Sequence, residues 1–397
     1  MDLQMDYADV CIKLLETCGD DPGHFPPAWM LLEYAEVRCA KIGMSLGKNQ
    51  PRSGENFNWE ALFGKFSDKV FSVREERTGE TVKMAWPFHP AAAWLCARGK
   101  TEIAGKVTAA ADALITNGHR DQDGLFDNSV FPGQLSTEIL AMTVPFLAWA
   151  GKISGEMRYF DEAVKQFKGY AARLYDPDAR LWHPGYLPGK ATTGMSARWL
   201  DYRDYMSSDF ALEKPGVFSG CWGRGEGYAL FALCELIYEL PDQHEGKTEL
   251  IRMREDMLEG LLAHQDPNGM WHQVLNDWGS YPETSGTGWI LYAIGRALKR
   301  NTVDREKFLP AYLRGLAGIT RYLAFDGSIF NGSVTCCCPG GRGTAVDFAL
   351  VGWCKNESNT IAPVLLAFQQ AFQNERGMHL IPPFSEVLDQ FSGECGK

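Results

Sequence analysis

The sequence predicts an all-α protein in which helical hairpins close into a ring. Helix-like spacing of apolar residues covers most of the 397 residues, whereas the alternation typical of strands is scarce. One kind of turn recurs between the helical segments, which indicates a repeat of hairpins. A share of 45% apolar residues is enough to bury a large core.

Apolar residues return every three or four positions in each predicted helix, so that one face of the helix can be buried. Ser136 or Thr137 opens one of these helices as a candidate N-cap. In chain order the predicted helices span residues 5–18, 27–42, 90–97, 101–116, 136–151, 158–174, 225–239, 247–264, 286–298, 306–323 and 361–373.

Four similar turns each follow a long amphipathic helix. An aspartate starts each turn, Pro or Gly sets its backbone, and an apolar residue follows. They lie at residues 121–126, 176–183, 266–272 and 326–330. About six hairpins fit the length, and their closure gives an (α/α) toroid around a cavity. An open solenoid is the rival, but neither end carries a polar capping repeat. No Gly/Pro-rich linker interrupts the chain, so residues 1–397 are expected to form a single domain.

The composition excludes several classes of partner. The formal net charge is -11 and no Lys/Arg-rich run is present, which argues against nucleic acid. Aromatic residues make up 12% of the chain, with 12 Trp. Indole and phenol rings suit carbohydrate because the faces of sugar rings stack on them. A large helical core also uses many aromatic residues, so both readings stay open.

The start of the chain and its cysteines predict a cytoplasmic protein. The first residues carry acids where a signal peptide has basic residues, and no apolar run could span a membrane. The 11 Cys are an odd number with irregular spacing, including Cys336, Cys337 and Cys338 in a row. No pair of the C-x-x-C type accompanies them, which argues for free thiols and against zinc.

The most informative stretch is residues 221–228, with the sequence C-W-G-R-G-E-G-Y. Glycine fills no volume, so three glycines in five positions indicate a loop entering a helix rather than a packed core. Trp offers a flat apolar face, Arg a fixed cation and Glu a carboxylate, which together suit a sugar site. No nucleophile elbow of the G-x-S-x-G type, phosphate-binding loop or trustworthy metal-ligand spacing is present.

Four motifs in order resemble glycoside hydrolase families 88 and 105. They are M-x-x-P-F-L-A at 142–148, W-G-R-G-E-G-Y at 222–228, L-A-H-Q-D-P-N-G-M-W-H-Q at 262–273 and P-E-T-S-G-T at 282–287. The resemblance spans roughly residues 85–375. It implies an (α/α)6 barrel and an unsaturated uronyl hydrolase that needs neither metal nor organic cofactor. The implied partner is an oligosaccharide with a 4,5-unsaturated uronic acid at its non-reducing end.

The resemblance assigns the central catalytic acid to Glu138. The families place an aspartate four residues before the Met of their M-x-x-P-F-L-A segment, and Glu138 occupies that position before Met142. The side chain is one methylene longer than aspartate. An acid in the first turn of a helix also complements the helix dipole without any catalytic role, which is the alternative.

Two histidines are further candidates. His183 falls where the families have a histidine facing the substrate, although a lone histidine is as often structural. The families' second active-site aspartate has no counterpart in residues 84–90, and His89 is the candidate replacement there.

The resemblance implies substrate contacts from Trp222, Arg224, Glu226, Tyr228 and Met142. Arg224 could fork two N–H groups to a uronate carboxylate. Capping a helix or pairing with a glutamate eleven residues later is the alternative. The families usually have Asn at the position of Glu226. Gln273, Glu283 and Thr284 are expected to support the site or its turns.

Two other functions compete with uronyl hydrolysis. A conventional glycosidase or a lyase on the same barrel would use Glu138 together with Glu226 or His183. A non-catalytic carbohydrate-binding protein would account for the missing second aspartate. The sequence identifies neither the uronate, the aglycone and the linkage nor the oligomeric state.

Overall fold

The structure, a computed structural model, describes residues 6–18, 101, 104–127, 133–187, 216–334 and 344–392. Most of these residues are helical. The helices are α1 (Tyr7–Cys18), α6 (Ala104–Asn117), α7 (Thr137–Ser154), α8 (Met157–Leu174), α9 (Gly223–Glu239), α10 (Lys247–Ala263), α11 (Thr284–Lys299), α12 (Arg305–Thr320), α13 (Ala345–Ala349), α14 (Ser358–Met378) and α15 (Phe384–Ser392).

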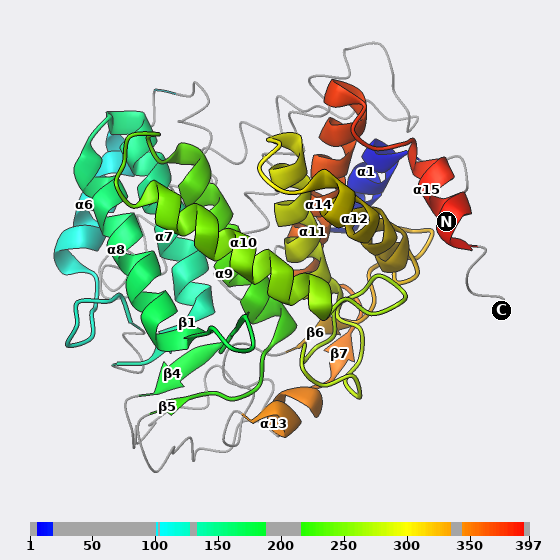
Figure 1. Ribbon diagram of the computed structural model, residues 1–397, viewed down its shortest axis with the longest axis horizontal. Helices are drawn as coiled ribbons and strands as arrows, with labels where there is room; N and C mark the ends of the chain where they lie inside the picture. The colour runs from blue at the N-terminus through cyan, green and yellow to red at the C-terminus, as the bar shows by residue number, and fades with distance from the viewer. Residues whose placement is uncertain are drawn as a thin grey trace.

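The long helices alternate between an inner and an outer layer. α7 packs against α9, α9 against α11, and α11 against α14, so these four form consecutive inner positions (Figure 1). α6 and α8 pack on α7, α10 packs on α9, and α12 packs on α11 from outside. α1 lies against α14 and α15 against α12. Within the described residues, the hairpins therefore run from an outer helix to the next inner one.

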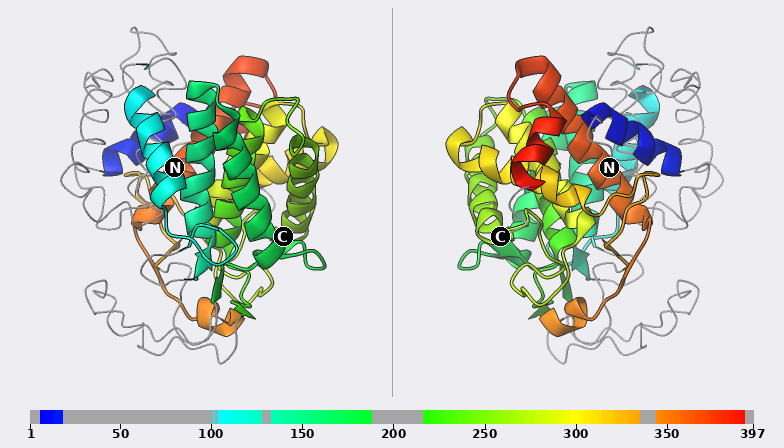
Figure 2. Two further views of the ribbon diagram at one scale, coloured as in Figure 1. Left: turned by 90° about the vertical axis from the view of Figure 1, so that its left-hand side faces the viewer. Right: turned by 90° about the vertical axis from the view of Figure 1, so that its right-hand side faces the viewer.

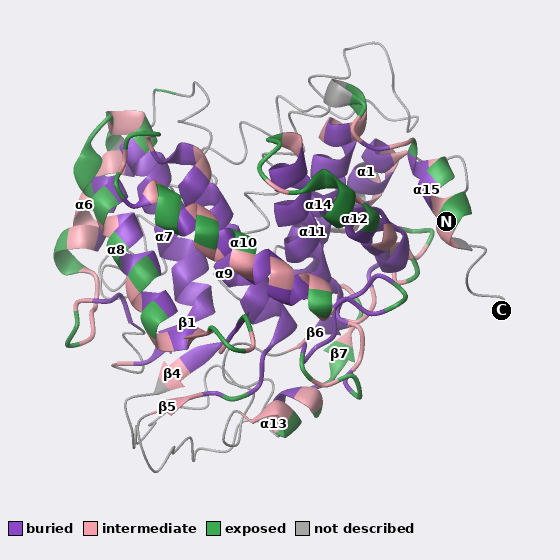
Figure 3. Ribbon diagram, viewed as in Figure 1, coloured by how far each residue is buried: buried purple, intermediate pink, exposed green. Residues whose placement is uncertain are grey.

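Burial separates the two layers. Every residue of α9 except Tyr238 is buried, whereas α10 buries only one face (Figure 3). A helix that is buried all round must have neighbours on every side, which is the position of an inner barrel helix. The buried apolar side chains of the described helices join in one cluster that follows the inner layer.

Short strands collect at the end of the barrel where the inner helices begin (Figures 1 and 2). They are β1 (Leu135–Ser136), β2 (Tyr175–Asp176), β3 (Leu181–Trp182), β4 (Gly185–Leu187), β5 (Gly216–Val217), β6 (Gly332–Ser333) and β7 (Trp353–Cys354). All pairings are antiparallel: β1 with β4, β4 with β5, β2 with β3, and β6 with β7. Because β1 leads directly into α7, this end carries the amino-terminal ends of the inner helices.

The four recurring turns connect each outer helix to the next inner one. In each turn the aspartate side chain accepts hydrogen bonds from backbone N–H groups two to four residues later. Gly124, Gly269 and Gly327 have φ values of 76°, 91° and 84°, a region that favours glycine. The prediction that these turns join hairpins is confirmed.

Every helix predicted within the described residues is present, with its ends shifted by a few residues. The predicted helices 27–42 and 90–97 lie outside these residues. α13 and α15 were not predicted. α13 is too short to show helical periodicity, although its Thr344 and Asp347 form a capping box that could have revealed it. None of the described helices has the length and apolarity needed to cross a bilayer.

Candidate active site

The predicted site residues lie where three inner helices begin. Glu138 is in the first turn of α7, Arg224 and Glu226 are in the first turn of α9, and Glu283 is the N-cap of α11. The first backbone N–H groups of a helix have no partner within it and carry partial positive charge. This end of the barrel therefore favours carboxylates and anionic ligands.

Glu138 is the second residue of α7, and 3% of its surface is exposed. Ser136 caps the helix, because its Oγ accepts a hydrogen bond from the Ile139 amide at 3.4 Å. Burial raises the pKa of Tyr228 well above its usual value, Arg224 opposes this, and the Glu138 carboxylate adds to the rise. The predicted acid thus shares one electrostatic environment with the predicted cation and with Tyr228.

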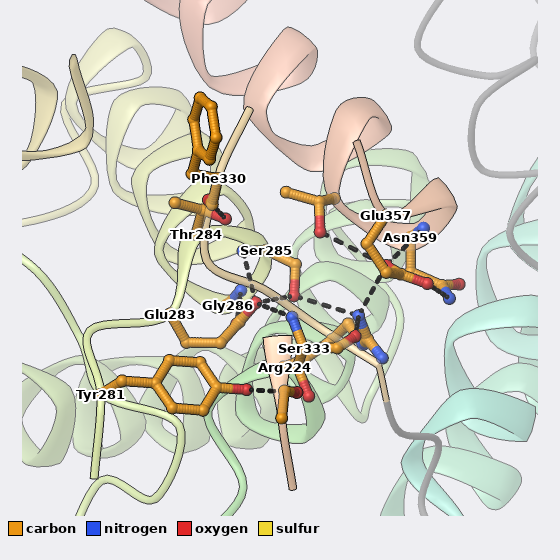
Figure 4. A network of polar contacts seen from close by, with 12 residues as sticks. Arg224, Tyr281, Glu283, Thr284, Ser285, Gly286, Phe330, Ser333, Glu357 and Asn359 are labelled. Carbon is orange, nitrogen blue, oxygen red and sulfur yellow. Dashed lines mark hydrogen bonds and ion pairs between the residues drawn. The ribbon is translucent and has the colours of Figure 1, made fainter. Parts of the chain in front are cut away.

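Arg224 is completely buried and binds other protein groups. Its Nη1 donates to Glu357 Oε2 at 3.2 Å, to the Ser333 carbonyl at 3.0 Å and to Ser285 Oγ at 3.3 Å (Figure 4). Burial acts to lower the pKa of Arg224, but the Glu357 carboxylate and weaker contributions from its neighbours raise it overall. Arg224 therefore remains charged and ties α9 to β6 and α14.

The alternative pairing of Arg224 with Glu235 is wrong. Glu235 lies eleven residues further along α9, about 16 Å away by the rise of a helix. Its carboxylate accepts hydrogen bonds from Tyr292 and Arg296 on α11 instead.

Several hydrogen-bond donors besides Arg224 bind the Glu357 carboxylate. It is the N-cap of α14, and its carboxylate accepts from the Asn359 amide and side chain at 2.8 Å each and from Thr360 Oγ at 3.3 Å. Burial raises the pKa of Glu357, while Arg224 and Asn359 oppose that rise. The sequence analysis missed Glu357. An acid just before the helix predicted at 361–373 was the available signal.

Glu283 caps α11, as expected for a supporting residue. Its carboxylate accepts from the Ser285 and Gly286 amides at 2.9 and 2.6 Å and from Ser285 Oγ at 2.7 Å (Figure 4). It also accepts from the Ser333 amide at 3.1 Å, which links α11 to β6. Thr284 and Gln273 donate to backbone carbonyls, and the supporting roles of all three residues stay predictions.

Glu226 is a buried acid that joins α9 to β3. Its Oε1 accepts from the Trp182 amide at 2.5 Å, and only 1% of its surface is exposed. Oε2 has no hydrogen-bond partner among the described residues. Burial raises the pKa of Glu226 well above its usual value, opposed by the Trp182 N–H, so its protonated form is favoured. The predicted substrate contact gains no support from this geometry.

His183 follows β3 and is partly buried. Burial lowers its pKa, while a backbone hydrogen bond with Phe218 and the charge of Asp176 oppose the shift. Its Nδ1 has no hydrogen-bond partner in the described part of the chain. A neutral imidazole with an uncommitted nitrogen can exchange a proton or bind a sugar hydroxyl.

Trp222 packs inside the protein. Its ring stacks on Phe348 at 5.9 Å between centroids and meets Tyr228 edge-on at 6.2 Å. The Arg224 guanidinium lies 4.8 Å from the centroid of the same ring. Trp222, Tyr228 and Met142 are at most 1% exposed. The predicted stacking face of Trp222 is therefore covered by Phe348.

The glycine-rich stretch lies where a loop enters α9 at Gly223, as predicted. It is buried and tightly packed, so the expectation that it is not part of a packed core is wrong. A Cβ on Gly227 would lie 2.5 Å from the Cβ of Trp289 on α11. One on Gly223 would lie 2.5 Å from the His272 carbonyl oxygen. These glycines let the beginning of α9 approach its neighbours more closely than any side chain would allow.

Two other sequence predictions cannot be placed. His89 and the run Cys336–Cys338 lie outside the described residues. Within those residues, no group of three or more His, Cys, Asp or Glu side chains is arranged to hold a metal ion. The expectation of a metal-free site stays a prediction.

A sequence model of Glycosyl Hydrolase Family 88 matches residues 80–348. The unsaturated rhamnogalacturonyl hydrolase of Bacillus subtilis is 27% identical over 184 residues, which are 46% of this chain and 47% of that protein. The unsaturated 3S-rhamnoglycuronyl hydrolase of an Alteromonas species is 31% identical over 188 residues, 46% of this chain and 40% of that protein. The chain thus spans about half the length of the curated relatives it matches.

Solved structures confirm the (α/α)6 barrel. A possible family 105 member from Salmonella enterica superposes with a TM-score of 0.72 at 17% identity, covering 93% of this chain and 94% of that one. The unsaturated glucuronyl hydrolase of Bacillus sp. GL1 superposes with a TM-score of 0.65 at 14% identity, covering 96% and 97%. At such low identity these likenesses show the fold alone.

Proposed function

Because the chain belongs to glycosyl hydrolase family 88, we propose that it removes a 4,5-unsaturated uronic acid from the non-reducing end of oligosaccharides. The uronic acid would be a glucuronyl or a galacturonyl residue. Two relatives named as unsaturated uronyl hydrolases support this substrate class. Polysaccharide lyases produce such ends, so a lyase must act before this enzyme.

The position of Glu138 carries the proposal. It is a buried carboxylate in the first turn of an inner barrel helix, beside Arg224 and Tyr228. The partial positive charge of the helix start stabilises its carboxylate, and burial stabilises its protonated form. A carboxyl group that serves as acid and then as base needs such opposing influences.

The proposed reaction is hydration of a vinyl ether. The Glu138 carboxylic acid transfers its proton to C4, and positive charge develops at C5 and the ring oxygen. The Glu138 carboxylate then takes a proton from a water molecule whose oxygen bonds to C5. The resulting hemiketal opens to a ketone, and C1 releases the aglycone as an alcohol. The proton that Glu138 donates is recovered from the attacking water molecule, so the reaction needs no cofactor.

The other site residues receive different degrees of support. His183 has an uncommitted nitrogen near the inner-helix starts, which supports a substrate contact or a proton transfer. Arg224 already binds three protein groups through Nη1, so it would act on a uronate mainly through its charge. Contacts from His89, Trp222, Tyr228 and Met142 stay predictions.

No observation favours the competing functions. A two-carboxylate glycosidase would need Glu226 to reach a water or a sugar oxygen. Glu226 instead bonds to the Trp182 amide and is 1% exposed.

The test follows the ultraviolet absorbance of the enol ether in lyase-generated oligosaccharides. Hydration predicts that absorbance falls on incubation with the wild type. Glu138→Gln should abolish the fall while the protein stays folded, because an amide cannot donate the proton. Glu255→Gln, on the exposed face of α10, is the matched control and should keep the wild-type rate. Near-wild-type rates in folded Glu138→Gln would contradict the assignment, rising absorbance would indicate a lyase, and no change a binding protein.

We further propose that the chain is one domain and works in the cytoplasm. The four cysteines in the described ranges, Cys11, Cys221, Cys234 and Cys354, are free, which suits a reducing compartment. The absence of a nucleic-acid partner stays a prediction from the net charge of -11.

A further inference from the structure

A cavity of about 750 Å³ opens at the end of the barrel opposite the candidate active site. It lies where α7, α9 and α11 end and where α8 and α10 begin, far from the short strands in Figure 1. Its size falls within the range of small-molecule sites. The site proposed for hydrolysis uses none of its residues.

Arg254 places a buried positive charge in the lining of the cavity. This side chain from α10 lines the cavity and has no exposed surface. Its Nη2 donates to the Thr302 carbonyl at 2.9 Å, but its Nε and Nη1 have no hydrogen-bond partner among the described residues. A buried guanidinium with N–H groups that make no hydrogen bond is disfavoured. An anion in the adjoining cavity would compensate its charge.

The rest of the lining is also cationic. Lys152, Lys247 and Arg300 join Arg254, against Glu239 and Asp242 as the acidic residues of the lining. Asp242 is paired with Lys247 at 2.7 Å. Four cations against two acids make this a positive site in a chain of net charge -11.

The helix ends around the cavity have opposing effects on a bound anion. The amino-terminal ends of α8 and α10 face the cavity, and neither has a side-chain cap on its N–H groups. The carbonyl ends of the inner helices oppose an anion. Lys247 offsets part of this by donating to the Leu240 carbonyl at 2.6 Å. Whether the cavity attracts an anion therefore depends on its Lys and Arg side chains.

Most of the remaining wall is apolar, and the Tyr238 hydroxyl adds a polar group to it. Met157, Phe160, Ile237 and Ile251 supply a hydrophobic surface. The Tyr238 hydroxyl is buried and has no partner among the residues described. Such a wall suits the carbon skeleton of a ligand, and the hydroxyl suits a second polar contact.

We propose that this cavity binds a small organic anion whose carboxylate or phosphate faces Arg254 and whose body lies against the apolar wall. A sugar acid or a sugar phosphate has this chemistry. The site is separate from the proposed catalytic end and does not depend on the proposed reaction.

Calorimetric titration of the full-length protein with galacturonate, galactose 6-phosphate, inorganic phosphate and neutral galactose tests the proposal. Both organic anions, or one of them, should bind more tightly than inorganic phosphate, and galactose should not bind. Tighter binding of only one anion identifies the headgroup. Arg254→Gln should weaken that binding by about tenfold or more, because the charge pair is lost. Glu138→Gln should leave it unchanged, which separates the cavity from the candidate active site.

Two further variants keep the test decisive. Arg300→Glu changes an exposed residue at the rim, so it should fold even if Arg254→Gln does not, and it should weaken binding at least about threefold. Arg158→Gln, an exposed arginine of α8 outside the lining, is the control and should bind as the wild type does. The proposal is overturned if no organic anion binds, if phosphate or galactose binds equally well, or if the folded cavity variants keep full affinity.

Discussion

The buried glutamates at the starts of the inner helices have different roles, which depend on the groups around them. Glu226 has one backbone donor, and burial raises its pKa. Glu357 has a guanidinium and further donors. Glu138 lies buried in the first turn of α7 and is the acid proposed for chemistry. The same residue type is thus a link with a raised pKa, an ion-pair partner or the proposed catalytic acid, because its surroundings differ.

Glu226→Gln should stabilise the protein increasingly as pH rises. Below the ordinary pKa of glutamate, about 4.3, the folded and unfolded states are both protonated. Above it the unfolded chain ionises while the folded Glu226 stays neutral, so its raised pKa reduces the stability of the fold as pH rises. Glutamine cannot ionise and keeps the acceptor for the Trp182 amide. Urea unfolding should give similar stabilities near pH 4 and a more stable variant at pH 8. A variant less stable than the wild type at pH 8 would contradict the buried neutral state.

Arg224→Met should reduce the free energy of unfolding by about 3–5 kcal/mol, because Glu357 is left buried without its cation. Replacing both residues by Met should be less damaging than the sum of the single changes. A double-mutant cycle in urea measures this coupling. The exposed pair Lys168 and Glu249 is the control and should couple by less than about 1 kcal/mol. Equal coupling in both pairs would contradict the buried ion pair.

At the scale of helices, the first residues of each described inner helix include an acid, a close approach to a neighbouring helix, or both. Glu138, Glu226, Glu283 and Glu357 lie at the starts of α7, α9, α11 and α14. Glycines allow these starts to converge: a Cβ on Gly286 would lie 2.6 Å from the backbone of α9. Carboxylates and converging helix ends complement each other, because the helix starts are partially positive.

Gly227→Ala should destabilise the protein by about 1–3 kcal/mol through overpacking of α9 against α11. The added Cβ would meet Trp289, whose ring is completely buried and cannot move aside. Gly105→Ala in α6 is the control, because a Cβ there has no neighbour within 4 Å. It should be neutral or stabilising by up to about 1 kcal/mol. Thermal unfolding measures both, and equal shifts would contradict the close approach.

At the scale of the whole molecule, recurring turns and alternating helices make one barrel with two different ends. The inner helices begin at the end with strands and buried acids, and they finish at the cationic cavity. This polarity follows from the hairpin repeat, because α7, α9, α11 and α14, the inner helices within the described residues, all begin at the same end. Two chemically distinct sites on one barrel are the consequence we propose.

All 11 thiols should be free if the protein works in the cytoplasm, as we propose. A thiol reagent under denaturing, non-reducing conditions should count every one of them. In the native protein Cys221 and Cys234 should react slowly, because burial raises the pKa of each to about 12. Half-buried Cys354 should react first among the described cysteines. Paired cysteines in the denatured count would place the protein in an oxidising compartment instead.

The sequence by itself determined the helices, the turns and the family. Helical periodicity and aspartate turns depend on residues within about four positions of each other, so they can be read along the chain. Glu138 could be proposed because it belongs to a contiguous motif. The same local reasoning wrongly placed residues 221–228 outside the packed core, because nothing in the chain itself shows which surface will approach a glycine.

Only the tertiary structure decided which side chains meet. Arg224 and Glu357 are 133 positions apart, and their pairing exists because α9 and α14 begin at the same end of the barrel. The stacking of Phe348 on Trp222 and the burial of two Arg254 nitrogens without a hydrogen-bond partner among the described residues have the same origin. Such contacts depend on ring closure between distant helices, and burial then sets their energies by removing water from the charges.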